Sequence, residues 1–405
     1  MSGAISSPST PSRQGKRHGI AFGQVIIGPP GAGKSTYAHG MQQFLTALGR
    51  PCHVVNLDPA TPSPSYPCSV NITDLISLES VMREYGLGPN GAMLYVAEYL
   101  EANLDWLVDR LDELLLQEGT LVPGYVIFDT PGQVELWTNH DSFKRVIERL
   151  TKMDHRLVAV HLSDAHYITD ASKFISVALL ALRATLQLEL PHVNVLSKID
   201  LLSTYGELPF DLRYYTECRD LEYLLDSLDI DTRPNPKMKA LNRAMVELVE
   251  QYGAVHFETL AVEDKRSMLK LVRIIDQAIG YVSLPGSVST LGDTTLNEKA
   301  SHVGGDFLRN MPTLDDLGDV DDVQERWGAR KAQHDEEEME AWGREWEMRR
   351  AASGKEYGEG DGAAAEKDEE EESDADEQVF RGMERAMPLS GMAAQVVRPS
   401  AAHDD

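Results

Sequence analysis

Residues 26–36 read IIGPPGAGKST, and Gly28, Gly33, Lys34 and Ser35 within them have the spacing of the P-loop, a pattern that binds phosphate groups. Glycine lets consecutive backbone amides point inward at phosphate oxygens, and the N-terminus of the following helix adds positive potential. Lys34 is expected to reach the β- and γ-phosphates, and the Ser35 hydroxyl to bind Mg²⁺. The predicted phosphate contacts are therefore Gly28, Pro29, Pro30, Gly31, Ala32, Gly33, Lys34, Ser35 and Thr36.

Residues 125–135, YVIFDTPGQVE, place an acid at the end of an apolar run, where a P-loop protein needs one. We predict that Asp129 holds Mg²⁺ through water, although an acid at this point can also cap the next helix. Gly132 can donate its amide to a γ-phosphate, and Gln133 is placed to orient the attacking water. Such a loop would report whether the γ-phosphate is present.

Two further carboxylates have roles that the residues alone leave open. Asp58 follows the apolar run of VNLDPA at 55–60, where it can serve Mg²⁺ or the nucleophilic water, or form a turn before Pro59. Glu135, two residues after Gln133, is a similar case. Both are candidates for catalysis, and Asp58 is also a candidate metal ligand.

Residues 194–200, NVLSKID, indicate which base is bound. The Asp200 carboxylate can accept hydrogen bonds from N1–H and the exocyclic amine of guanine, whereas adenine presents an acceptor at N1. The methylenes of Lys198 can lie over the base plane. The usual form of this motif begins with Asn or Thr, so Ser197 is a departure that weakens the support around the base. The stretch predicts GTP and GDP as ligands, rather than ATP.

A loop near the end of the expected domain completes the predicted base site. The stretch FETLAVED at 257–264 follows the last predicted strand. A backbone amide in this loop is positioned to meet the O6 atom of guanine, and the amide of Leu260 or Ala261 is our candidate.

Alternating strand and helix patterns predict the elements that would position these residues. Continuous apolar strands separated by helices imply a parallel sheet covered on both faces, an α/β three-layer sandwich of the P-loop NTPase class with a mostly parallel sheet. Longer helical insertions are expected near 71–118 and 203–250. The expected strands are 22–27, 53–57, 125–128, 157–162, 192–196 and 254–257, with helices that include 34–48, 169–190 and 265–279.

Composition divides the chain into three parts. Residues 1–19 are expected to be a flexible leader, residues 20–282 one domain, and residues 283–405 an acidic, largely disordered extension. Residues 291–405 carry −18 of the total net charge of −27. Within the extension, Met339, Trp342 and Trp346 lie at helical spacing, so 331–350 is either a docking helix or a transient charged one.

Charge and cysteine content exclude several classes of function. An acidic chain argues against direct binding of nucleic acid or an anionic membrane, both of which need basic counter-charge. No secretory signal and no apolar run of spanning length is evident. Three irregularly spaced cysteines suit neither a disulfide framework nor a zinc site, which predicts a reducing compartment, the cytoplasm or the nucleus; the three are Cys52, Cys68 and Cys218.

A corner at 84–96, EYGLGPNGAMLYV, has turn chemistry that the residues alone cannot assign to a function. Gly88, Pro89 and Asn90 lie within a run of turn-forming residues, which serves a plain connector as well as it serves the placing of one amide side chain. The neighbouring motifs have to decide between these two roles.

Taken together, these stretches resemble the GPN-loop GTPases over residues 22–282, through VNLDPA, GLGPNGAMLY, DTPGQVELW, HLSDAHYITDASKFIS and YYTECRDLEYLLD. The resemblance implies that the loop Gly88, Pro89 and Asn90 projects toward the nucleotide of a partner subunit, where Asn90 contacts phosphate in trans. It also implies that Asp58 and Glu135 lie near magnesium and the attacking water. Asp170, in a family-like stretch before a helix, is expected to be an N-cap outside the site.

The resemblance implies a dimeric GTPase with slow turnover, paired with itself or with other GPN-loop GTPases. It further implies a role in assembly and nuclear delivery of RNA polymerases II and III, through their subunits or assembly factors. We therefore expect a cytoplasmic protein that shuttles to the nucleus. Two other functions stay open, a scaffold that binds GTP with negligible turnover and an ATP-dependent P-loop kinase.

Overall fold

The computed structural model describes residues 21–115, 124–206, 208–225, 236–281 and 318–329. Its centre is a sheet of seven parallel strands in the order β3-β2-β4-β1-β5-β6-β7. The strands are β1 (Ala21–Ile27), β2 (Cys52–Asn56), β3 (Val70–Asn71), β4 (Gly124–Asp129), β5 (Arg156–Asp164), β6 (His192–Ser197) and β7 (Phe257–Leu260). The predicted α/β sandwich is confirmed, and every pairing in this sheet is parallel.

Two of the strands differ from the sequence prediction. The two-residue strand β3 was not predicted, because so short a run carries no periodic pattern. The last strand is Phe257–Leu260 and not 254–257. Apolar residues lie on both sides of Phe257, so the sequence pattern left the register of this strand undetermined. As a result, Leu260 belongs to the sheet and not to the loop that follows it.

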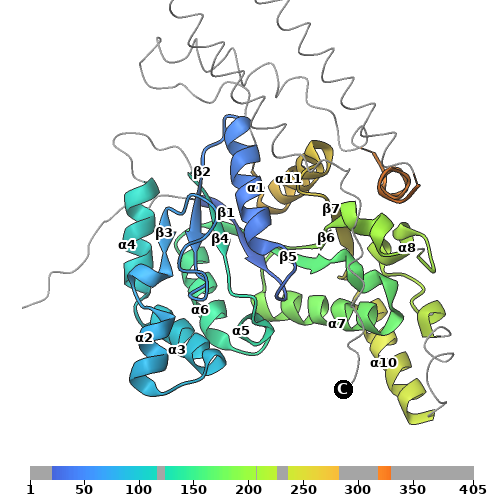
Figure 1. Ribbon diagram of the computed structural model, residues 1–405, viewed down its shortest axis with the longest axis horizontal. Coiled ribbons are helices and arrows are strands. Elements are labelled where there is room, and N and C mark those ends of the chain that lie inside the picture. Colours follow the sequence, from blue (N-terminus) through green and yellow to red (C-terminus); the bar gives the residue numbers. More distant parts are fainter. Residues whose placement is uncertain (1–20, 116–123, 207, 226–235, 282–317, 330–405) are drawn as a thin grey trace, which may run out of the picture. The chain divides into compact units, whose positions relative to one another are not determined.

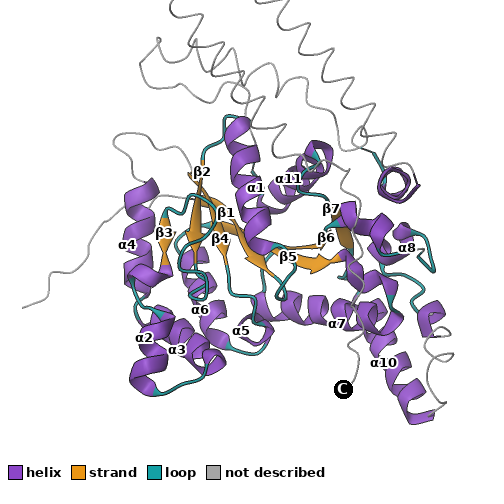
Figure 2. Ribbon diagram, viewed as in Figure 1, coloured by secondary structure: helices purple, strands orange, loops and turns teal. Residues whose placement is uncertain are grey.

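Helices α1 (Lys34–Ala47) and α11 (Lys265–Ile279) cover one face of the sheet, and α5 (Val134–Thr138), α6 (Asp141–Thr151) and α7 (Ala171–Leu188) cover the other (Figures 1 and 2). Successive side chains of each strand point to opposite faces of the sheet, so each strand contributes apolar residues to the hydrophobic core on both faces. Ile26 packs with α1 and α11, whereas Val25 and Ile27 pack on the opposite side. The junctions at which these helices begin are therefore held by two packed layers.

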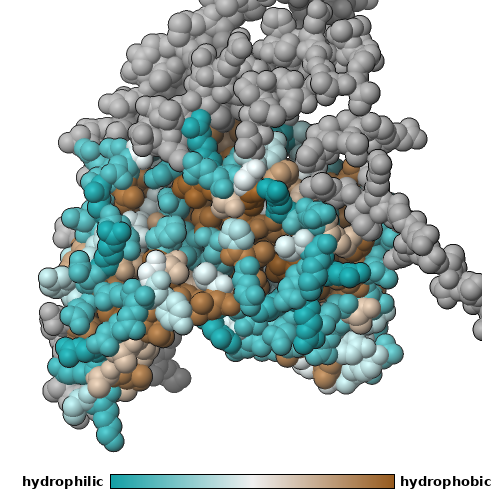
Figure 3. Space-filling model, turned by 180° about the vertical axis from the view of Figure 1, so that it is seen from behind, coloured by the Kyte–Doolittle hydropathy of each residue, from teal (hydrophilic) through white to brown (hydrophobic). Residues whose placement is uncertain are grey.

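Helix α7 bears on the expectation that the sequence holds no apolar run of spanning length. Among the described residues this one helix has the length and hydropathy of a spanning helix. Its buried residues, which include Phe174 and Leu182, pack in the core of the domain, which accounts for its composition. Seen from behind in Figure 3, the described surface is mainly hydrophilic, with hydrophobic residues gathered near the middle of that face.

The two long segments between strands are helical where the structure describes them. The first contains η1 (Ile72–Asp74), α2 (Leu78–Tyr85), α3 (Pro89–Ala102) and α4 (Leu104–Leu115). The second contains α8 (Leu212–Glu217) and α10 (Pro236–Tyr252), and is preceded by the short helix η3 (Ile199–Thr204). The Gly88-Pro89-Asn90 corner forms the start of α3, with Gly88 as N-cap and Pro89 in the first turn.

A short segment of the acidic extension also belongs to the folded domain. Residues 318–329 form α13 (Val320–Gln324) and the π-helical turn η5 (Glu325–Ala329). Trp327 is only 6% exposed, in the same core as α7, α8 and α10. The fold thus includes residues beyond the boundary expected at 282. The expected leader at 1–19 and the expected helix at 331–350 lie outside the described residues.

Candidate functional site

The strand order brings the predicted phosphate and metal residues to one edge of the sheet. Strand β4 lies between β1 and β2, with Asp129 paired in register with Ile26 on one side and Asn56 on the other. The P-loop follows β1, and Asp58 lies two residues after β2. Because all strands are parallel, these three segments leave the sheet at its carboxyl edge, where α/β proteins bind their ligands.

Close packing against β5 fixes the P-loop at its first glycine. Gly28 has φ 144°, and a Cβ atom there would lie 2.2 Å from the carbonyl oxygen of Leu162. A side chain at this position would therefore clash with the neighbouring strand. Lys34, in the first turn of α1, is buried and donates to the carbonyl oxygens of Gly28 at 3.1 Å and Pro29 at 3.2 Å. Burial lowers the pKa of Lys34, while Asp129 and Asp58 oppose that shift.

Asp129 has the contacts expected of a magnesium-site carboxylate. Its Oδ2 atom accepts a hydrogen bond from Ser35 Oγ at 2.8 Å and another from the Tyr66 hydroxyl at 2.8 Å. Its Oδ1 atom is buried and has no hydrogen-bond partner. Burial raises the pKa of Asp129, opposed by the bonds from Ser35 and Tyr66 and by the charge of Lys34. This unsatisfied oxygen could bind a cation or accept a hydrogen bond from a water molecule of its hydration shell.

The donor set fits Mg²⁺ bound together with a nucleotide. Among the described residues no group of three His, Cys, Asp or Glu side chains could hold a metal ion. Magnesium differs from such all-protein sites because it keeps several waters and uses one or two protein oxygens with substrate phosphates. Ser35 and Asp129, beside the P-loop, supply that smaller set. They are the residues that would hold the ion.

Asp58 has the turn role that the sequence left open beside a metal role. Its Oδ1 atom accepts from the Ala60 amide at 2.9 Å, and its Oδ2 atom from Thr61 Oγ1 at 3.3 Å. Its charge still acts on both Lys34 and Asp129, which places it close to the phosphate site. Glu135 is exposed in the first turn of α5. A direct role for either carboxylate in catalysis stays a prediction.

Gly132, Gln133 and Asn90 lie together beside the P-loop. A Cβ atom on Gly132 would lie 3.0 Å from Lys34 Nζ and 3.2 Å from the Pro30 Cα atom, so the backbone of the 130–133 loop passes directly over the P-loop. Gln133 Nε2 donates to Asn90 Oδ1 at 2.9 Å, within the same chain. The exposed corner at the start of α3 therefore reaches the residue predicted to orient water.

The end of β6 supports the predicted base site. The buried Ser197 hydroxyl lies 2.8 Å from the carbonyl oxygen of Ala32 in the P-loop and 3.1 Å from that of Ser163 in β5. Ser197 thus ties the base motif to the phosphate loop, which is support that the sequence did not predict from serine. Lys198 has φ 59° and pairs with Asp164 at 2.8 Å. Asp200 follows in the first turn of η3.

The predicted contact of the Leu260 or Ala261 amide with guanine O6 stays a prediction, and the strand before this loop ends later than we expected. Leu260 is buried as the final residue of β7, paired with Ser197. The Ala261 amide donates to Ser267 Oγ at 3.1 Å, so its hydrogen is already used within the chain. Because the strand ends three residues later than predicted, the loop after it begins at Ala261.

Tyr66 and Asp164 are contacts that sequence reasoning did not place in the site. Tyr66 comes from a proline-rich loop with no periodic pattern, and its hydroxyl reaches Asp129. Asp164 lay in a recognised stretch, but its pairing with Lys198 depends on the register of β5 and β6. Asp170, by contrast, is the N-cap of α7, as predicted, and accepts from the amides of Ser172 and Lys173.

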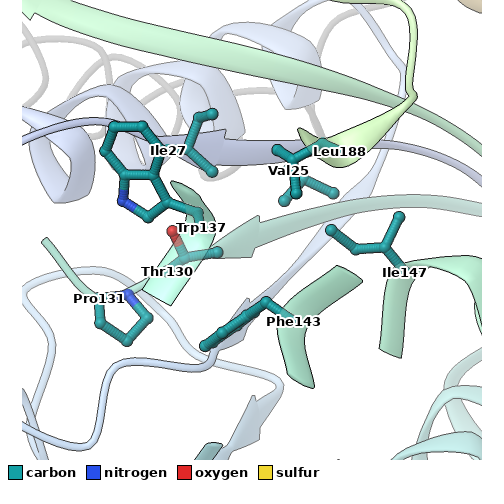
Figure 4. Close-up of a pocket in the computed structure, with 8 residues that line it drawn as sticks. All are labelled: Val25, Ile27, Thr130, Pro131, Trp137, Phe143, Ile147 and Leu188. Atoms are coloured by element: carbon teal, nitrogen blue, oxygen red, sulfur yellow. The ribbon is translucent and has the colours of Figure 1, made fainter. Parts of the chain in front are cut away.

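A small apolar cavity lies behind the 130–133 loop (Figure 4). Trp137 of α5 and Thr130 line it, together with side chains from β1, α6 and α7. The Trp137 ring packs edge-on against His161 of β5, with centroids 5.1 Å apart. Both the Trp137 indole N–H and the His161 Nε2 atom are buried without a hydrogen-bond partner. Burial lowers the pKa of His161 to about 4.

The parallel sheet, the P-loop and the Ser35–Asp129 pair together define a P-loop nucleotide-binding protein. Residues 26–281 match the family described as conserved hypothetical ATP binding protein. The chain is 45% identical to GPN-loop GTPase 2 of Schizosaccharomyces pombe over 79% of this chain and 96% of that protein. It is 49% identical to GPN-loop GTPase 2 of Danio rerio over 65% of this chain and 82% of that one. The chain belongs to the GPN-loop GTPase family.

Comparison with a solved structure agrees on the fold. A GTPase from Pyrococcus abyssi, solved in its apo form, superposes with a TM-score of 0.52 at 24% identity. The match covers 65% of this chain and all of that chain. The GTPase relatives support hydrolysis of GTP by this chain, and the family resemblance expected from the motifs is confirmed.

Proposed function

We propose that this chain is a magnesium-dependent GTP switch that works as a dimer. The observation that carries the proposal is the arrangement around Asp129, in which the P-loop hydroxyl of Ser35 and an unsatisfied buried carboxylate oxygen adjoin the lysine of the phosphate loop. Bound Mg²⁺ would neutralise charge that develops on the phosphates. Lys34 would hold the β- and γ-phosphates, and Gln133 would orient the attacking water.

Hydrolysis separates this switch from a scaffold that binds GTP with negligible turnover. Phosphate formation in a quenched single-turnover reaction is the measurement, because it follows the chemical step and does not wait for GDP or phosphate to dissociate. Gln133→Ala should slow phosphate formation at least tenfold, while Tyr252→Phe, an exposed change on α10, should leave it unaltered. Equal rates for wild type and Gln133→Ala would favour the scaffold.

The cellular role is proposed from the family resemblance. The switch would serve assembly and nuclear delivery of RNA polymerases II and III, in a protein that moves between cytoplasm and nucleus. Affinity purification of wild type beside Lys34→Ala tests this role, because the variant loses the charge that holds the phosphates. Polymerase subunits or assembly factors should be recovered with the wild type and depleted with the variant. Equal recovery of these proteins with the wild type and the variant would show that their association does not depend on bound nucleotide.

The Asn90 contact raises the question of which subunit it serves. The family resemblance predicts action on a partner's nucleotide, whereas the structure has Asn90 bound to Gln133 of its own chain at 2.9 Å. With its N–H used by Asn90, the Gln133 amide would keep its carbonyl oxygen directed at water. The two arrangements are chemically compatible, because the bond to Gln133 uses Asn90 Oδ1, whereas a contact with a phosphate would use the Nδ2 amide.

Mixed dimers would tell the two roles apart. If Asn90 acts in trans, a dimer of one Asn90→Ala and one Gln133→Ala subunit keeps one complete site, namely the Asn90→Ala subunit's own Gln133 with the partner's asparagine. Such dimers should recover about half the wild-type rate per dimer. If Asn90 acts in cis, both sites stay impaired and mixing restores nothing. The homodimers of each variant are the controls.

A further inference from the structure

Residues 318–329, which we call the C-terminal strap, contact both loops that are expected to recognise the base. The strap lies beyond residue 281, where the match to the family model ends. It is anchored on α8, where the Leu212 amide donates to Gln324 Oε1 at 2.6 Å and Arg213 pairs with Asp321 at 3.0 Å. An N-terminal capping box formed by Asp319 and Asp322 fixes the start of its helix.

The first contact is with the base motif itself. Trp327 is buried in the core cluster that also contains Ile199 and Leu202, and its turn η5 packs against η3. These two apolar residues lie on either side of Asp200 in η3. The indole therefore forms part of the apolar support beneath the short helix that carries the carboxylate expected to read guanine.

The second contact is with the loop after β7. Arg326 lies 3.6 Å from Asp264 Oδ1, and its guanidinium is 4.9 Å from the centre of the Trp327 ring. Asp264 ends this loop and caps α11, accepting from the Arg266 amide at 3.1 Å. Two adjacent residues of the strap thus reach two separate segments of the base site.

We propose that the C-terminal strap holds η3 and the loop after β7 in register, so that Trp327 and Arg326 are positioning residues for guanine recognition by Asp200. The inference rests on the base site proposed above. A hydrogen bond weakens steeply when its geometry changes, so a small shift of η3 would reduce the contact of Asp200 with the exocyclic amine. The phosphate loop is held by Gly28 against β5 and by the Ser197 hydroxyl at the end of β6, which precedes η3, so phosphate affinity should not depend on the strap.

Three ligands separate positioning from general loss of structure. GTP carries the exocyclic amine, inosine triphosphate lacks it, and inorganic tripolyphosphate has no base. We expect Trp327→Ala in the full chain to lower the preference for GTP over inosine triphosphate about tenfold, or about 1.4 kcal/mol. Affinity for tripolyphosphate should not change. Arg326→Ala should act in the same direction, and Trp327→Phe should restore most of the preference.

Matched controls come from the same chain. Trp106→Ala removes a partly buried indole from the separate core cluster beside α4, and should leave the preference unaltered. A chain that ends at Ala332 keeps the strap and should match the full chain, whereas one that ends at 317 should behave as Trp327→Ala does. If Trp327→Ala does not fold, Arg326→Ala carries the test.

The results that would overturn the proposal are distinct from those that would overturn the base site. An unaltered preference in Trp327→Ala and Arg326→Ala refutes the strap proposal, as does an equal loss for all three ligands. Asp200→Asn tests the base site alone. If that change also leaves the preference for GTP intact, the assignment of the base site is wrong, and the strap has no recognition loop to hold.

Discussion

Replacing Asp129 by asparagine should separate stability from magnesium binding. In the folded chain the carboxylate has one oxygen without a partner and one that accepts from Ser35 and Tyr66. Burial raises its pKa, so the ionised form is less stable in the folded chain than in water. The carbonyl oxygen of asparagine can still accept from both hydroxyls, while the new amide takes the place of the unsatisfied oxygen.

Two opposing terms give the expected size of the effect. Two charge-assisted hydrogen bonds become neutral and the attraction between Lys34 and the carboxylate is lost, which together cost about 2 to 3 kcal/mol. Removal of the buried charge returns a similar amount. The free energy of unfolding without ligand should therefore stay within about 1 kcal/mol of wild type. Loss of a carboxylate that holds a metal ion or its water should weaken Mg²⁺ binding by about 10- to 100-fold.

Urea unfolding of Asp129→Asn without nucleotide measures the first quantity, and calorimetric titration of Mg²⁺ into the GTP-loaded protein measures the second. Asp112→Asn, on α4, is a control because it also neutralises a buried carboxylate. It should leave magnesium affinity unaltered. Wild-type magnesium affinity in Asp129→Asn would refute the site. A loss of stability well beyond about 2 kcal/mol would refute the reasoning about its charge.

Three further changes test the framework around the site. Arg50→Lys removes two parallel hydrogen bonds from the Arg50 guanidinium to the Asp276 carboxylate, each 2.9 Å long. It should lower the free energy of unfolding, measured in urea, by about 2 kcal/mol. An unchanged free energy would show that the pair does not contribute to stability. Because burial holds the pKa of His161 at about 4, below the ordinary value, stability should fall as pH drops from about 6.5 toward 4. His161→Gln should reduce that fall over the same range, and an identical fall would exclude His161 as its source. Ser197→Ala removes the hydroxyl that lies 2.8 Å from the Ala32 carbonyl oxygen, and should weaken GTP binding about fivefold in calorimetry; unaltered binding would mean that strand pairing alone holds the motif.

Motifs at the ends of strands were predictable because their chemistry depends on local sequence. Each of these motifs joins an apolar run to a polar residue whose type suits the binding of a phosphate, a metal ion or a base. They are the P-loop, Asp129 and the Ser197–Asp200 stretch. The sheet order then brings Asp129 to Ser35, a contact between residues 94 positions apart in sequence. No periodic pattern in the sequence predicts a contact over such a separation. It was expected only because a P-loop serine and a strand-end acid bind the same magnesium ion.

The contacts that escaped prediction depend on tertiary structure alone. Tyr66 reaches Asp129 from a loop whose path is set by prolines and by β3, a strand of two residues. Trp327 lies in a stretch where acidic composition predicted disorder. Its buried indole, the ion pair to Asp264 and the contacts with α8 nevertheless hold the stretch on the domain. Composition averages over many residues, so it cannot indicate that one side chain of a mainly acidic segment is buried in the core.

The two outer strands of the sheet are its shortest, β3 with two residues and β7 with four. Each edge strand consequently offers few backbone N–H and C=O groups with which another polypeptide could form β-sheet hydrogen bonds. A second subunit would therefore gain little by extending the sheet from one molecule into the next. In the dimer proposed above, contact would therefore use helices and corners, such as the one at the start of α3, and the sheet of each subunit would stay separate from that of its partner.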